Sequence, residues 1–82
     1  MTNYSARVGR TIRLIRELKG IKLRAMAHEM ELGFSGWSRC ETGDTVLTIV
    51  QLEKAARILE MSPSKILAMV ENLTGDISPR TK

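Results

Sequence analysis

The stretch KLRAMAHEMELGFSGWSRCETG, residues 22–43, decides the fold of this 82-residue chain. Its first part, about residues 22–30, places four apolar side chains on one face of a helix about two turns long: Leu23, Met26, Ala27 and Met30. A break is expected near residues 31–33, where Gly33 interrupts the helical pattern. The stretch therefore begins with a short amphipathic helix that ends abruptly.

The second part of the stretch predicts another short helix at residues 34–41. Trp37 and Cys40 stand three residues apart and form its inner face, and Gly43 should follow its end. Two short helices joined by a tight turn cannot bury their apolar faces alone. Further helices must therefore complete the core.

The flanking sequence supplies those helices. A first helix is predicted at about residues 5–19, before Gly20, from apolar side chains at helical spacing: Val8, Ile12, Ile15 and Leu18. A fourth helix should begin at Thr48, which stands at the spacing of a capping box from Gln51. Its expected apolar positions are Ile49, Leu52, Ala55, Ala56 and Leu59. The pattern is that of packed helices.

A fifth helix and a polar tail complete the chain. Ser62 and Pro63 form a cap with proline in the first helical position, ahead of an apolar stripe: Ile66, Met69, Val70 and Leu73. Residues 74–82 carry almost no apolar side chains and are expected to form a flexible tail. The prediction is an all-α, compact five-helix domain at residues 1–73.

Composition excludes several other classes of protein. Aromatic residues make up only 4% of the chain, which suits packed helices better than a sheet. The single cysteine, Cys40, forbids an internal disulfide, and with the single histidine, His28, leaves too few ligands for structural zinc. No apolar run could span a bilayer. We expect a cytoplasmic protein without metal, cofactor or membrane contact.

Positive charge is concentrated in the first half of the chain. The formal net charge is +4, and all of this excess lies in residues 1–43, whereas the remainder balances to zero. A polyanionic partner is therefore plausible, although solvated basic helices would give the same count. The two-helix unit strengthens the first interpretation. The outer face of residues 34–41 could enter a DNA major groove about 12 Å wide while the preceding helix crosses the phosphate backbone.

At these residues the chain resembles a known family, the Cro and phage-repressor-like helix-turn-helix domains, also called the Xre family. The resemblance spans about residues 8–71 without a gap and is carried by four segments: VGRTIRLIRELKG at 8–20, Met26-Ala27, SRCETG at 38–43, and Leu59-Glu60-Met61-Ser62 leading into Ile66-Leu67. It implies the phage-repressor-like fold and a DNA-binding transcriptional regulator, either repressor or activator. It also implies a structural ion pair between Arg16 and Glu41, for which a bidentate fork is chemically suited.

The resemblance further implies which residues face DNA. On the third helix they are Gly33, Phe34, Ser35, Gly36, Ser38 and Arg39. Arg39 is the strongest candidate reader of a base, because its fork matches guanine O6 and N7, though it could instead contact phosphate alone. Lys22 and Arg24, near the start of the second helix, are expected phosphate anchors. Thr42 and Thr45 either contact the DNA backbone or are merely exposed.

The recognition segment departs from the family pattern at several positions. Leu23 replaces the usual glutamine, Glu31 replaces the usual turn glycine, and Phe34 joins two glycines in the third helix. Phe34 could touch a thymine methyl group, wedge at a base step or pack against Leu32. Gly36 could permit close backbone approach or simply be tolerated. Recognition could therefore depend partly on DNA shape.

Other side chains suit packing better than chemistry. Trp37 is expected to anchor the core rather than stack on a base, and Cys40 to fill the core rather than sense redox state. His28 is expected on the outer, solvated face of the second helix. The methionines mostly occupy apolar faces, which favours packing over metal binding. None of these residues predicts a ligand site.

A homodimer is expected, because one unit of this size reads few base pairs and paired half-sites lie roughly 34 Å apart. The fifth helix has apolar groups on more than one side, which suggests a dimer interface: Ile66, Leu67, Met69, Val70 and Leu73. All of them could instead pack internally. A protein-interaction module such as an antitoxin is the alternative function. An enzyme is disfavoured, because the sequence shows no paired carboxylates, activated nucleophile or phosphate loop.

Overall fold

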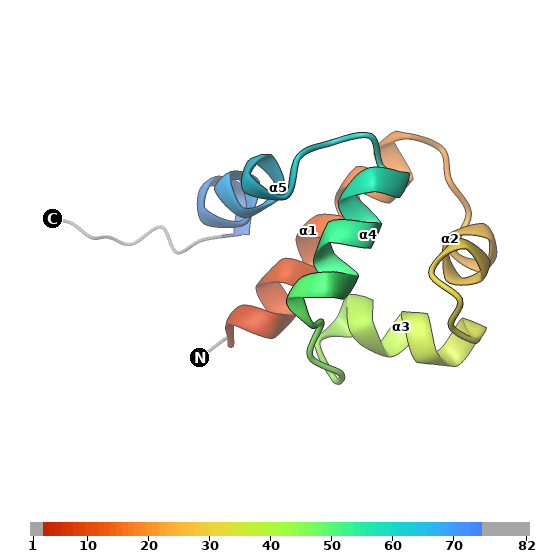
Figure 1. The fold of residues 1–82 in the computed structure, drawn as a ribbon. Helices are drawn as coiled ribbons and strands as arrows, with labels where there is room; N and C mark the ends of the chain where they lie inside the picture. Colours follow the sequence, from red (N-terminus) through yellow and green to blue (C-terminus); the bar gives the residue numbers. More distant parts are fainter. Residues whose placement is uncertain (1–2, 75–82) are drawn as a thin grey trace, which may run out of the picture.

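Figure 1 shows the arrangement of the helices in the computed structural model, which describes residues 3–74. The described elements, in chain order, are α1 (Tyr4–Leu18), α2 (Leu23–Glu29), α3 (Phe34–Thr42), α4 (Ile49–Ile58), α5 (Pro63–Met69) and a π-helical turn, η1 (Val70–Thr74). The prediction of five helices is confirmed within this range. The predicted tail lies outside the described residues from residue 75 onward.

Side chains close to the helix starts cap them as the sequence predicted. Thr48 and Gln51 form both bonds of the capping box: the Gln51 backbone N–H donates to Thr48 Oγ1 at 3.0 Å, and the Thr48 N–H donates to Gln51 Oε1 at 2.9 Å. Ser62 accepts from the Lys65 N–H at 3.2 Å, with Pro63 in the first helical position. Each cap satisfies a backbone N–H that the helix itself leaves unpaired.

Four turns that end helices use a left-handed residue. Gly20 and Gly43 follow α1 and α3 with φ of 75° and 92°. Glu31 and Glu60 adopt the same conformation after α2 and α4, with φ of 62° and 59°. After α4 the Met61 N–H closes the turn on the Ala56 carbonyl at 2.9 Å. The two glutamates therefore carry the strain that glycine would avoid.

The core lies between α1 and the helices that surround it (Figure 1). Its wholly buried side chains include Trp37, Ile12, Met26, Leu59 and Ile66. Ile49 is one of the apolar positions that the sequence gives to α4, yet its side chain is 84% exposed and lies outside the core. The reason is its position in the first turn of α4, beside an open groove that no other element of the described chain fills.

Helix α1 touches the end of α3 backbone to backbone. A Cβ atom at Gly9 would overlap the carbonyl oxygens of Cys40 and Glu41. A Cβ atom at Gly43 would likewise overlap Ala6, in addition to its positive φ. Two glycines therefore set the distance between the helix that anchors the domain and the helix that was predicted to read DNA.

We expect replacement of Glu60 by glycine to stabilise the protein. Glu60→Gly removes the left-handed strain after α4, and the gain should exceed the entropy that glycine adds to the unfolded chain by about 0.5–1 kcal/mol. For a domain of this size that gain raises the midpoint of thermal unfolding by roughly 2–8 °C. Glu60→Ala is the control, since it removes the same carboxylate and keeps the Cβ. Equal midpoints for the two variants would refute the strain argument.

Candidate nucleic-acid interface

A buried ion pair joins α1 to the end of α3. Arg16 and Glu41 are 6% and 5% exposed. The guanidinium grips the carboxylate with two bonds, from Nε to Oε2 at 2.7 Å and from Nη2 to Oε1 at 3.1 Å. This is the bidentate pair that the resemblance implied, and both charges are compensated where water cannot reach them.

Two further bonds complete this network. Trp37 donates its indole N–H to Glu41 Oε2 at 2.7 Å, and Arg16 Nη1 donates to the Ile21 carbonyl at 2.7 Å. The network therefore ties together α1, α3 and the turn that leads to α2. Neither bond was predicted from the sequence, although Trp37 and Glu41 stand four residues apart on one helix, a spacing that brings side chains together.

The inner face of α3 is used entirely for packing. Trp37 is 0% exposed and Cys40 is 2% exposed, as the core interpretation expects. Burial raises the pKa of the Cys40 thiol, and the negative charge of the Glu41 carboxylate raises it further. A protonated, enclosed thiol is a poor nucleophile, so this cysteine acts as a small apolar side chain. Only the opposite face of α3 remains for a ligand.

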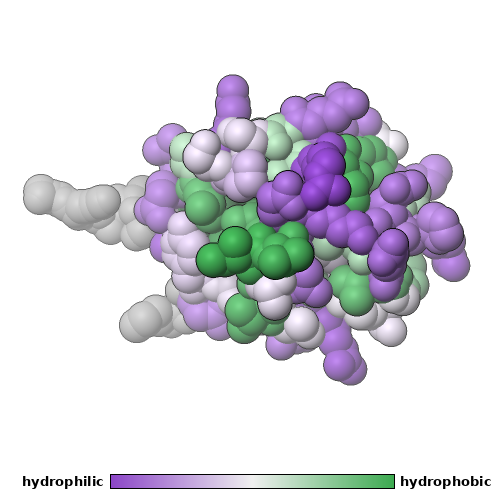
Figure 2. All heavy atoms as spheres, in the orientation of Figure 1, coloured by the Kyte–Doolittle hydropathy of each residue, from purple (hydrophilic) through white to green (hydrophobic). Residues whose placement is uncertain are grey.

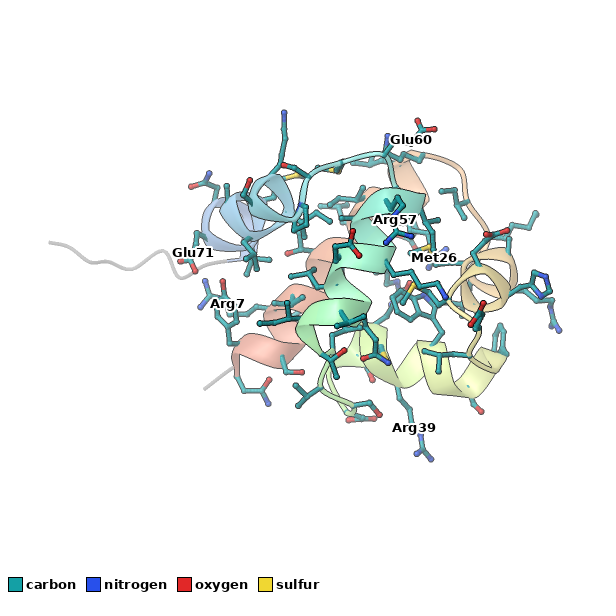
Figure 3. The ribbon with its side chains drawn as sticks, viewed as in Figure 1. Arg7, Met26, Arg39, Arg57, Glu60 and Glu71 are labelled. Atoms are coloured by element: carbon teal, nitrogen blue, oxygen red, sulfur yellow. The ribbon has the colours of Figure 1, made fainter. Side chains whose placement is uncertain are left out.

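The outer face of α3 is open to solvent. Phe34, Ser35 and Arg39 are exposed, Gly36 and Ser38 are half-buried, and Gly33 is the exposed residue before the helix. The Arg39 side chain extends away from the body of the protein (Figure 3). The six residues predicted to face DNA thus lie together along one helix and its N-terminal cap.

The last residue of α3 and the loop after it continue this surface. Thr42 and Thr45 are both exposed. The Thr42 hydroxyl donates to the Arg39 carbonyl at 3.1 Å, and the Thr45 backbone N–H reaches the same carbonyl at 3.2 Å. The loop is therefore held against the helix that carries Arg39, with the Thr45 hydroxyl free of any bond in the described part of the chain.

Helix α2 adds two cations beside the start of α3. Lys22 is the exposed residue that precedes α2, and Arg24 is exposed in its first turn. The Arg24 guanidinium lies over the Phe34 ring, 5.0 Å from its centroid. Phe34 is 48% exposed, so it does not fill the core. This contact was not expected from the sequence.

Internal packing does not require glycine at residue 36. A Cβ atom there would meet only Leu32, at an ordinary contact distance of 3.8 Å.

His28 is exposed on α2, as expected. Within residues 3–74 no three histidine, cysteine or acidic side chains gather as metal ligands. No helix in the same range has the length and apolar character needed to cross a membrane.

Helix α5 faces the core with residues that were expected at a dimer interface. Ile66 and Val70 are both 0% exposed, so neither can contact a second copy, and this part of the prediction is corrected. Leu67 and Met69 are half-buried, and the side chain of Leu73 lies outside what the structure describes. The reason is that η1 folds back on α1, where Glu71 Oε2 accepts from the Tyr4 hydroxyl at 3.0 Å.

Comparison with known proteins gives one family match. A helix-turn-helix domain family matches residues 7–69, which confirms the helix-turn-helix expectation. A comparison with curated proteins finds no match.

Solved structures share the fold. The clp gene regulator ClgR from C. glutamicum has a TM-score of 0.87 and 19% identity, over 95% of this chain and 100% of that one. The restriction-modification controller protein C.AhdI from Aeromonas hydrophila has a TM-score of 0.69 and 24% identity, over 74% and 92%. A mutant of the controller protein C.Esp1396I has a TM-score of 0.79 and 28% identity, over 92% and 100%.

We expect loss of the buried carboxylate to destabilise the domain strongly. Glu41→Ala leaves the Arg16 guanidinium and the Trp37 N–H without their acceptor, which should lower the free energy of unfolding by about 3–5 kcal/mol. Glu17→Ala is the matched control: Glu17 also contacts Arg16, at 3.8 Å, but its side chain is 51% exposed. Its loss should cost under about 1 kcal/mol. Urea unfolding followed by circular dichroism measures both, and similar losses would contradict the assignment.

Proposed function

Since the chain belongs to the helix-turn-helix domain family, we propose that it is a transcriptional regulator that binds a specific sequence of double-stranded DNA as a homodimer. The observation that carries this proposal is the division of α3 into two faces. Its inner face is locked by the Arg16–Glu41–Trp37 network, and its outer face presents Arg39 and small polar groups to solvent. A rigid helix with such an outer face suits the major groove.

In this proposal Arg39 reads a base and α2 positions the domain. The Arg39 fork can donate to guanine O6 and N7, whereas Ser35 and Ser38 add short, less discriminating hydroxyls. Lys22 and Arg24 neutralise phosphates at the start of α2. Thr42 and Thr45 contribute hydroxyls at the other end of α3. Because Gly36 has no side chain and no other residue packs closely there, the DNA can approach the α3 backbone at this position.

The Arg24–Phe34 contact gives Phe34 a defined role in binding. The Phe34 ring at the start of α3 lies against the Arg24 guanidinium at the start of α2. The contact restricts an exposed side chain that would otherwise sample many rotamers. We infer that Phe34 is a positioning residue for Arg24. A pre-positioned cation loses less entropy when it meets a phosphate.

Regulation then follows from occupancy of an operator in the cytoplasm. Two copies on inverted half-sites would cover neighbouring promoter sequence and block or recruit polymerase. The similar structures are named as regulators, ClgR as a clp gene regulator and C.AhdI as a restriction-modification controller, which supports a regulatory role. No catalytic step is part of the proposal. Selection of bound sequences from random DNA tests it: inverted repeats are expected, and recovery of no preferred sequence would overturn it.

Arg39 and Lys22 should differ in their effects on DNA binding. Arg39→Ala should reduce discrimination between the selected operator and random DNA by about 5- to 150-fold, because it removes a bidentate base contact. Lys22→Ala should weaken both complexes alike, because it removes one phosphate contact. It should also reduce the slope of log affinity against log salt concentration by about one unit. Fluorescence anisotropy over a salt series measures both. Unchanged operator preference in Arg39→Ala would exclude this residue as a base reader.

Phe34 should act through Arg24. Phe34→Leu is expected to weaken operator binding about 2- to 5-fold, the size of an exposed cation–π contact, while Phe34→Tyr keeps the ring and the affinity. In an Arg24→Ala background the Phe34→Leu change should have no further effect, since no cation remains to be positioned. Equal losses in the two backgrounds would show that Phe34 contacts DNA independently.

A further inference from the structure

We propose that a second copy of this chain docks on an apolar surface at the start of α4, the α4 patch, formed by Val46, Ile49 and Val50. This inference rests on the proposed function in requiring a dimer, and it assigns the surface through which the dimer forms. It replaces the earlier expectation of an interface on the fifth helix, because Ile66 of α5 and Val70 at the start of η1 belong to the core.

The α4 patch is unusually exposed for aliphatic side chains. Val46, Ile49 and Val50 are 70%, 84% and 74% exposed. Figure 2 shows hydrophobic residues gathered on this face, in the region of the first turn of α4 in Figure 1. Contiguous aliphatic exposure of this kind marks an interaction surface, whereas single exposed residues do not.

The shape of this region suits a copy of itself. Beside the projecting Ile49 lies a groove of about 340 Å³, whose apolar lining comes from α1, the α3–α4 loop, α4 and α5, and includes Tyr4, Val8, Leu47, Leu52 and Leu67. An interface with two-fold symmetry needs a projection and a recess on the same surface, because each copy supplies both. Ile49 of each copy can then enter the groove of the other.

The charges favour a second copy over other occupants. Every residue that lines the groove is uncharged, although the chain carries a net charge of +4. Two copies can therefore meet here without opposing like charges. Beyond the α4 patch, Glu53 and Arg57 of the same helix form an ion pair at 2.6 Å, so these two charges neutralise each other within one copy.

The location also meets the requirement of a paired DNA site. The α4 patch adjoins the end of α3 through the short loop after Gly43 (Figure 1). Copies joined there can present both α3 helices to one side of a duplex, as half-sites roughly 34 Å apart require. DNA itself is not the occupant, because aliphatic side chains offer phosphates neither charge nor hydrogen bonds.

Analytical ultracentrifugation of the full chain without DNA tests the proposal. The wild type should sediment as a particle whose molecular mass is about twice the 9.2 kDa of one chain. Ile49→Glu should raise the dissociation constant of the dimer by at least about 100-fold, because it buries a carboxylate against aliphatic groups. Leu18→Glu is the matched control, since Leu18 is 75% exposed on α1 outside the α4 patch, and it should remain dimeric.

The following results would support or overturn the α4 patch as the dimer interface. Circular dichroism should show that Ile49→Glu stays folded, because its side chain makes few contacts in the single chain. A wild type that stays monomeric at about 100 µM, or an Ile49→Glu variant that stays dimeric, would overturn the assignment. Anisotropy with a duplex carrying one half-site separates this proposal from the proposed function: Ile49→Glu should still bind it. Dimers that bind no DNA would refute the proposed function and leave the α4 patch standing.

Discussion

Arg16 and Glu41 bring opposite charges together in the interior, where neither could remain without the other. Removing two ions from water is costly, and their attraction offsets that cost only when the geometry is good and the remaining polar atoms are bonded. Trp37 and the Ile21 carbonyl provide those bonds. The result is one connected network from α1 through α3 to the start of α2. Its main effect is to fix orientation, because every member constrains the direction of the others.

That fixed orientation divides α3 between two tasks. One face carries Trp37, Cys40 and Glu41 into the core, and the other carries Arg39 into solvent. The backbone contact at Gly9 holds α1 against the end of the same helix. A helix of nine residues would be marginal in water by itself. Packing on α1 therefore makes α3 rigid enough to serve as a recognition surface.

The surfaces of this small domain are separated by chemistry. Cations and small polar groups lie along α2 and α3, whereas aliphatic groups gather at the start of α4. The first composition suits a phosphate backbone and base edges, and the second suits another apolar surface. The α3–α4 loop connects them, so a contact at one surface sets the position of the other relative to DNA.

The resemblance to the Cro and phage-repressor-like family implied the residues on the outer face of α3, and the sequence alone determined the helices. Their signals act within a few residues: caps at Thr48 and Ser62, glycines that end helices, and apolar spacing. Only the tertiary structure decided which of the apolar groups on the last two helices and at the start of α4 face the core. It buried Ile66 and Val70, exposed Ile49, and joined Arg24 to Phe34. These outcomes depend on which elements meet in the folded protein. The spacing of apolar residues along one helix does not show which other helices will pack against it.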